Sequence, residues 1–183
     1  DKEGFAKSPE LRNQRLYADV VSRVADCYLT KNDYNNASTH YDLATAISFP
    51  GQDYAYFQKS MIKGLQNKPY EKIVLLEELI KVVPKSSFLD DSYFQLGETH
   101  FSLQNSRAAE LSYLQILALK GKSNLITRAL LKLGLITYNK GDLEKAIKSF
   151  YSRLYGSESP FNLKAFGQLN KKLIPSHYEA FME

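Results

Sequence analysis

The sequence predicts an all-α protein built from stacked pairs of helices, and three observations support this. A set of small and bulky residues recurs along the 183-residue chain at nearly constant spacing. Short turn signals divide each recurring unit into two halves, and apolar residues return at helical intervals within the halves. Repetition of this kind is typical of solenoids, in which each unit buries its apolar face against its neighbours.

Each recurring unit contains a small residue, a second small residue 12 positions later and a bulky residue four positions beyond that. The step between units is 35 residues once and then 37 residues twice. The second unit is the most divergent, because a lysine and a serine replace the usual small pair. In chain order the sets are Ala25, Ala37 and Tyr41; Ser60, Lys72 and Leu76; Gly97, Ala109 and Tyr113; and Gly134, Ala146 and Phe150.

This spacing predicts two antiparallel helices in every unit. Small residues let the paired helices approach closely, and the bulky residue fills the space one turn further on. Polar segments that favour turns lie between the two helices of each pair. These segments are Lys31-Asn32-Asp33, Asn67-Lys68-Pro69, Gln104-Asn105-Ser106 and Lys140-Gly141-Asp142.

The two ends are predicted more coarsely. Residues 9–17 extend or precede the first helix, and residues 1–8 read as a connection from an upstream repeat. Beyond Pro160, apolar residues recur at helical spacing over about 161–174, which predicts a helix that caps the stack. Because the chain begins at Asp1 rather than at Met, we expect it to be a fragment of a longer protein.

The order Leu-Gly, Tyr/Phe, Ala, Tyr/Phe, Pro resembles the tetratricopeptide repeat (TPR) family. Residues 141–147 are similar to the sequence with which the second helix of a TPR begins. The resemblance implies a right-handed superhelical α-solenoid that forms one domain, with the C-terminal capping helix described above. Its four repeats would span about 18–51, 53–86, 90–123 and 127–159.

The connection that carries Pro84 and small polar residues resembles the bacterial cell-envelope branch of the family. That branch includes outer-membrane assembly lipoproteins and the periplasmic coordinator of the Tol-Pal system. The resemblance favours a periplasmic or outer-membrane-associated location, although a cytoplasmic one stays open.

Within the family, the first helix of each pair lines a concave groove. Carried over to this chain, the groove is acidic at its start, at Asp19 and Asp26, and apolar and aromatic further on. Such a row of side chains offers a large contact area for a protein or peptide segment. The predicted partner-binding residues are Tyr54, Phe57, Met61, Phe94, Phe101, Leu131, Leu135 and Tyr138.

The resemblance therefore implies a non-catalytic scaffold for protein–protein interaction. Three alternatives stay open. The groove residues could pack against adjacent helices or a terminal segment, the chain could be a structural segment of a longer array whose partners are its own flanking repeats, or it could be an accessory subunit of an outer-membrane or polysaccharide-handling assembly. The clamp with which some family members hold a C-terminal carboxylate is missing, since Ser22, Asp26, Phe57, Met61, Phe94 and Glu98 occupy its positions.

The sequence predicts no catalytic centre, metal site, cofactor or small-molecule substrate. His40, His100 and His177 are far apart and lack metal-ligand spacing. We expect His100 to pack as an aromatic ring, His40 to face solvent and Cys27 to be a small packing residue. A pocket that joins His100 to carboxylates such as Glu98 would favour an enzyme instead.

Charge and hydropathy exclude two further classes of protein. The net charge is +4 and the charges are scattered, so the basic patch of a nucleic-acid-binding protein is missing. The longest apolar stretch, near Ile73 to Ile80, is interrupted by Glu77 and Glu78. It is therefore too short and too polar for a membrane span.

Overall fold

The computed structural model describes residues 9–47, 51–119, 123–142 and 145–146. Every helix or strand among these residues is an α-helix, which confirms the predicted all-α TPR-type solenoid. The predicted capping helix at 161–174 lies outside the described residues. The helices are α2 (Pro9–Thr30), α3 (Tyr34–Thr45), α4 (Gln52–Leu65), α5 (Pro69–Val82), α6 (Leu89–Ser102), α7 (Ser106–Ala118) and α8 (Ile126–Asn139).

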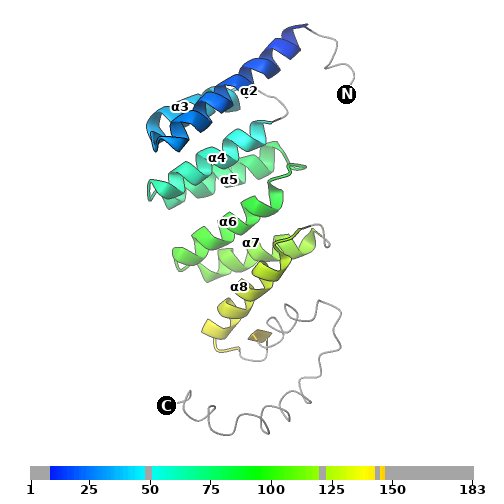
Figure 1. The fold of residues 1–183 in the computed structure, drawn as a ribbon. Helices are drawn as coiled ribbons and strands as arrows, with labels where there is room; N and C mark the ends of the chain where they lie inside the picture. The colour runs from blue at the N-terminus through cyan, green and yellow to red at the C-terminus, as the bar shows by residue number, and fades with distance from the viewer. Residues whose placement is uncertain (1–8, 48–50, 120–122, 143–144, 147–183) are drawn as a thin grey trace. The chain divides into compact units, whose positions relative to one another are not determined.

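Contacts divide the chain into two compact units, Asp1–Leu119 and Lys120–Glu183. In the first unit, α2 pairs with α3, α4 with α5 and α6 with α7, and successive pairs meet where α3 contacts α4 and α5 contacts α6 (Figure 1). The second unit contributes α8. The organisation of all four repeats as one domain stays a prediction.

Helix ends follow the repeat step found in the sequence. The first helices of the pairs end at Thr30, Leu65, Ser102 and Asn139, which are 35, 37 and 37 residues apart. Two residues after each of these ends, the backbone is left-handed, with φ of 58° at Asn32, 56° at Asn67, 59° at Gln104 and 79° at Gly141. The same turn therefore closes each first helix.

Capping residues start the second helices. The side chain of Asp33 accepts a hydrogen bond from the Asn36 amide (3.2 Å), and Asn105 caps Ala108 in the same way (3.2 Å). Such caps satisfy backbone donors that the first helical turn leaves free. The α5 helix has no side-chain cap and instead starts with Pro69, whose missing amide hydrogen is harmless there.

Gln104 is the least suitable of the four left-handed turn residues. Asparagine tolerates this conformation and glycine adopts it freely, whereas a long side chain is disfavoured. We expect Gln104→Gly to raise the free energy of unfolding by up to about 1 kcal/mol. Urea denaturation tests this, with Asn32→Gly as the control that should gain less. A destabilised Gln104→Gly protein would contradict the assigned turn.

The small and bulky repeat residues meet in the core. Ala25 and Ser60 are fully buried, as are the bulky Tyr41, Leu76 and Tyr113. These positions confirm the spacing that was read from the sequence.

Gly97 shows why the first position must be small. A Cβ atom there would lie 2.5 Å from Cε1 of Tyr113. No real Cβ contact is this short, so any larger residue at position 97 must displace the tyrosine ring.

The divergent second repeat accommodates a lysine at a position that is alanine elsewhere. The Lys72 side chain passes Gly64, where an added Cβ would lie 3.3 Å from Lys72 Cδ. Its Nζ donates a hydrogen bond to Oε1 of Gln95 on α6 (2.7 Å). Burial lowers the pKa of Lys72, while the nearby charge of Glu98 opposes this effect. The lysine thus joins the second repeat to the third.

Candidate partner-binding groove

The acidic start of the predicted groove is a hydrogen-bonded cluster that joins three helices. Asp26 of α2 accepts hydrogen bonds from the hydroxyls of Tyr41 on α3 (2.5 Å) and Tyr54 on α4 (2.8 Å). Its other carboxylate oxygen lies 3.4 Å from the Arg23 guanidinium. Asp26 therefore joins the first two repeats and is not simply a free negative charge.

Tyr41 is the most perturbed member of this cluster. Burial raises the pKa of its hydroxyl well above the usual value of 10.0, and the hydrogen bond to Asp26 adds to the effect. The pKa of Tyr54 is raised for the same two reasons. Both hydroxyls therefore stay protonated, as donors to Asp26, at neutral pH.

This perturbation predicts alkaline destabilisation. Above about pH 10 the unfolded chain loses tyrosine protons that the folded chain keeps, so the free energy of unfolding falls as pH rises. We expect that fall to be less steep in Tyr41→Phe, because one raised pKa is removed. Urea unfolding at a series of pH values on both sides of 10 measures the slope. Equal slopes in both proteins would contradict the assignment.

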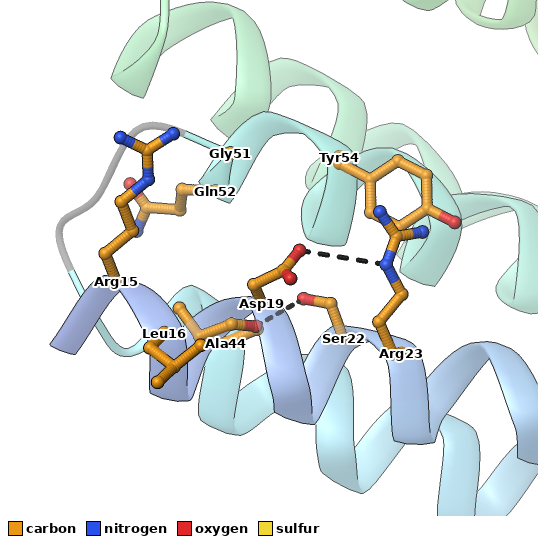
Figure 2. Close-up of a pocket in the computed structure, with 10 residues that line it drawn as sticks. Arg15, Leu16, Asp19, Ser22, Arg23, Ala44, Gly51, Gln52 and Tyr54 are labelled. Carbon is orange, nitrogen blue, oxygen red and sulfur yellow. Dashed lines mark hydrogen bonds and ion pairs between the residues drawn. The ribbon is translucent and has the colours of Figure 1, made fainter. Parts of the chain in front are cut away.

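A pocket of about 590 Å³ adjoins the cluster between α2 and α4 (Figure 2). The charged residues Arg15, Asp19 and Arg23 stand at its α2 side, and Gln52 and Tyr54 belong to α4. Arg23 forms an exposed ion pair with Asp19, 3.7 Å between Nε and Oδ1. The remaining lining residues are Leu16, Ala18, Ser22, Ala44 and Gly51. The pocket lining thus combines apolar residues with charges of both signs.

Aromatic rings continue from this pocket along α4. Phe57 is half-buried and stacks on Phe88, with ring centroids 5.1 Å apart, and Tyr54 lies 6.0 Å from the same ring. Phe88 comes from the connection ahead of α6. It lies between the predicted repeats 53–86 and 90–123, where the repeat pattern assigns no groove position. Part of the Phe57 surface is therefore covered by the chain itself, in line with the alternative that groove residues pack against other parts of the chain.

Phe94 does not belong to an open groove. It is 3% exposed, and its ring packs edge-on against Tyr113, with centroids 5.8 Å apart. The hydroxyl of Tyr113 on α7 donates to Glu98 of α6, so the third repeat repeats the Tyr41–Asp26 contact of the first repeat. The prediction that Phe94 contacts a partner is corrected: this residue is part of the core.

Met61 and Phe101 are half-buried, and each lies on a first helix of the first unit. With Tyr54 and Phe57 they form what we call the inner apolar surface, defined by these four residues. Their partial exposure leaves hydrocarbon and ring area available for contact. The remaining predicted residues lie in the second unit, on α8, where Leu131 is half-buried, Leu135 is 36% exposed and Tyr138 is 51% exposed.

One prediction about a single residue is wrong, because Cys27 is exposed rather than packed. His40 is partly exposed; its Nδ1 lies 2.8 Å from the Asn36 carbonyl oxygen, and its ring lies 5.1 Å from that of Tyr28.

His100 is half-buried, and its Nδ1 has no hydrogen-bond partner. Glu98 lies two residues earlier on the same helix, so the two side chains point about 160° apart around the helix axis. They do not converge on one site. Among the described residues, no group of three or more histidine, cysteine or acidic side chains is arranged to hold a metal ion. No described helix is long and apolar enough to span a membrane.

The helix pairs and their register define a TPR-type helical solenoid. A sequence comparison agrees, because residues 90–123 and 127–151 match the tetratricopeptide repeat family model. These two segments of the chain therefore match tetratricopeptide repeats. A search of the curated proteins finds no match.

Solved structures with a similar fold share little sequence with the chain. MamA has a TM-score of 0.64 at 19% identity, covering 77% of this chain and 78% of its own. BtubC from P. vanneervenii has a TM-score of 0.65 at 17% identity, covering 85% of this chain and 67% of its own. The pilF protein of Pseudomonas aeruginosa has a TM-score of 0.59 at 15% identity, covering 77% and 62%. At such low identity the likeness concerns the fold alone.

Proposed function

We propose that the chain is a non-catalytic scaffold that binds a segment of a partner protein on the inner apolar surface. The observation that carries this proposal is the partial exposure of Tyr54, Phe57, Met61 and Phe101 on successive first helices. Aromatic and methionine side chains supply much of the binding energy in protein interfaces. A pre-formed helical array also holds them in place at little entropic cost.

The chemistry of the partner follows from the surface and the pocket beside it. An apolar side chain of the partner fits against Phe57 and Met61. Arg15, Arg23 and Asp19 at the pocket offer charges of both signs to polar groups next to that side chain. We therefore propose a peptide segment with apolar anchors and flanking polar residues, bound along α4 toward α6. In the second unit, taken by itself, the exposed Leu135 and Tyr138 of α8 offer an apolar contact area of their own.

A location in the cell envelope is the finer part of this proposal. Its support is the resemblance of the segment 84–93, a connection with a proline and small polar residues followed by the start of α6, to the envelope branch of the family. In that setting the chain would be an accessory subunit of an outer-membrane or polysaccharide-handling assembly. As a segment of a longer array, it would instead use its surface to hold flanking repeats.

A pair of matched variants tests the proposed surface. Met61→Asp with Phe101→Asp places two charges on the inner apolar surface, whereas Leu111→Asp places one on an exposed apolar position of the second helix α7. We expect the double variant to weaken capture of the partner at least tenfold, since each buried charge opposes apolar contact. Leu111→Asp should bind normally.

Affinity capture from the native host, with isothermal titration of the purified partner, gives the readout. Circular dichroism must show that both variants keep their helices. Normal binding by the folded double variant would place the binding site elsewhere and overturn the proposal.

A further inference from the structure

A second cavity, of about 430 Å³, lies where α3, α4 and α5 meet. It shares no lining residue with the pocket of Figure 2 or with the inner apolar surface. Because two lysines of α4 take part in its lining, we call it the lysine pocket. Its lining includes Ser38 and Asp42 of α3, Lys59 and Lys63 of α4, and Tyr70 and Val74 of α5.

The two lysines distinguish the second repeat from the other three. The repeat steps of 35 and 37 residues identify the equivalent positions, and none of these carries a lysine or an arginine. Packing of the repeat therefore does not require a cation at either place. The equivalents are Val24, Leu96 and Leu133 for Lys59, and Tyr28, His100 and Thr137 for Lys63.

Both lysines are mostly buried, whereas their acidic partners are not. The side chains of Lys59 and Lys63 are 19% and 17% exposed. Lys59 forms an ion pair with Asp42 of α3, and Lys63 Nζ lies 2.6 Å from Oε2 of Glu71 on α5. Removing a charge from water costs about as much as such a pair returns, so stability alone does not explain these cations.

Hydrogen-bonding capacity remains in the lysine pocket. An ammonium group can donate three hydrogen bonds, and Lys59 and Lys63 each have one acidic partner among the described residues. The hydroxyl oxygen of Ser38 is shielded from solvent and has no hydrogen-bond partner in the described part of the chain. The pocket therefore suits a group that accepts hydrogen bonds.

The balance of charge favours an anionic acceptor. Glu71 pairs with Lys63 and also with Lys68, 3.3 Å away, so three lysines face the two carboxylates of Asp42 and Glu71. The charge of Glu78 helps to raise the pKa of Tyr56, but neither of these residues lines the pocket. One positive charge is thus in excess, which a single carboxylate of a ligand would complement.

The rim of the pocket indicates that the ligand belongs to a protein. Tyr70 is 72% exposed and Val74 60% exposed, and the two lie one turn apart on the same face of α5. Sites for small molecules enclose most of their ligand, which an open rim of this kind cannot do. A partner segment can instead lay an apolar side chain on the exposed rim.

We propose that the lysine pocket binds an acidic side chain of a partner protein. Its carboxylate accepts hydrogen bonds from Lys59 and Lys63, and an apolar residue next to it packs on Tyr70 and Val74. This site is separate from the inner apolar surface, so the chain has two surfaces for protein partners.

The test is an NMR titration of the complete, isotope-labelled chain with the blocked dipeptide acetyl-phenylalanyl-glutamate amide. In two matched probes, glutamine or lysine replaces the glutamate. We expect saturable shifts of the Ser38, Lys59 and Lys63 amide signals, with a Kd of about 1 mM for the glutamate probe. The glutamine probe should bind about fivefold more weakly or worse, since it lacks the charge. Equal or tighter binding of the glutamine or lysine probe, or no saturable shift at about 20 mM, would overturn the proposal.

An added charge at the rim gives a variant that keeps the fold. Val74→Asp is expected to weaken binding of the glutamate probe about tenfold or more, because like charges repel. Leu111→Asp is its matched control, since it lies 37 residues later at the same repeat position and is 56% exposed. Equal effects of the two substitutions would contradict a site in the lysine pocket.

Removal of the two cations tests the source of the preference. Lys59→Gln with Lys63→Gln should abolish the preference for the glutamate probe over the glutamine probe. Lys81→Gln with Lys85→Gln changes the net charge equally at exposed positions and should preserve it. The same preference in both double variants would overturn the proposal. Met61→Asp should leave binding of the glutamate probe unchanged, so the result is independent of the inner apolar surface.

Discussion

Gly97→Leu is expected to destabilise the first unit strongly, by about 1 to 3 kcal/mol, because overpacking forces helices and rings apart. The reason is the 2.5 Å separation between a Cβ at position 97 and the ring of the buried Tyr113. Thermal and urea denaturation give the change in unfolding free energy. An unchanged melting temperature would mean that α6 and α7 do not pack in the assigned register.

Gly64→Ala is a matched control for this substitution. An added Cβ there meets only the Lys72 side chain, at 3.3 Å from Cδ, and a flexible lysine can move aside. We expect little loss of stability, because alanine also favours the helix over glycine. A large loss in Gly64→Ala would show that the effect at Gly97 is not specific to the tyrosine ring.

Replacement of Asp26 is expected to have the second large effect. Asp26→Leu leaves the hydroxyls of the buried Tyr41 and the half-buried Tyr54 without their acceptor. Hydrogen bonds to a charged group each contribute about 1.5 to 3 kcal/mol, so the loss of both is expected to cost about 3 to 6 kcal/mol. Adding Tyr41→Phe to Asp26→Leu should recover part of this loss, because it removes one buried hydroxyl that has lost its hydrogen-bond acceptor.

Asp19→Leu is the control for Asp26→Leu. Asp19 lies on the same helix and forms only an exposed ion pair with Arg23. Such pairs contribute little to stability, so this variant should unfold almost like the natural protein. Equal losses at the two positions would contradict a special role for Asp26 in joining α2, α3 and α4.

The sequence explains which repeats have a hydrogen bond between a tyrosine and an acid. The bulky tyrosines of the first and third repeats face Asp26 and Glu98, each of which directly follows the small residue of its first helix. In the second and fourth repeats the bulky residue has no hydroxyl, and the corresponding position is Met61 or Leu135. At the position after the small residue, an acid therefore occurs only in the two repeats whose bulky residue is a tyrosine with a hydroxyl to donate. The family resemblance places both acids at groove positions, so packing and binding positions overlap in this repeat.

The repeat register was predictable because it depends on local spacing. Small residues, bulky residues and turn signals recur together, and helix ends at Thr30, Leu65 and Ser102 keep the same step. The exposure of single side chains was less predictable, because it depends on what lies beyond each helix. Phe94 turns into the core against Tyr113, while Phe88 enters the surface from a connection that no repeat pattern describes.

Cys27 shows the same limit at the first repeat. Its equivalents Ile62 and Thr99 are buried, so a packing role was a reasonable prediction from the repeat alone. The thiol is exposed because no described helix covers α2 as α3 covers α4. Sequence periodicity gives the face of a helix, but only the neighbouring helices decide whether that face is buried.

Site-specific photocrosslinking of the protein in its native host tests the proposed function most directly. A photoreactive residue is placed at Met61, on the inner apolar surface, and in a separate protein at the exposed Leu111 of α7. We expect Met61 to crosslink to one defined segment of another protein, rich in apolar residues, and Leu111 not to reach it. Crosslinks from Met61 that go only to this chain's own residues would contradict the account, because the surface would then be internal packing.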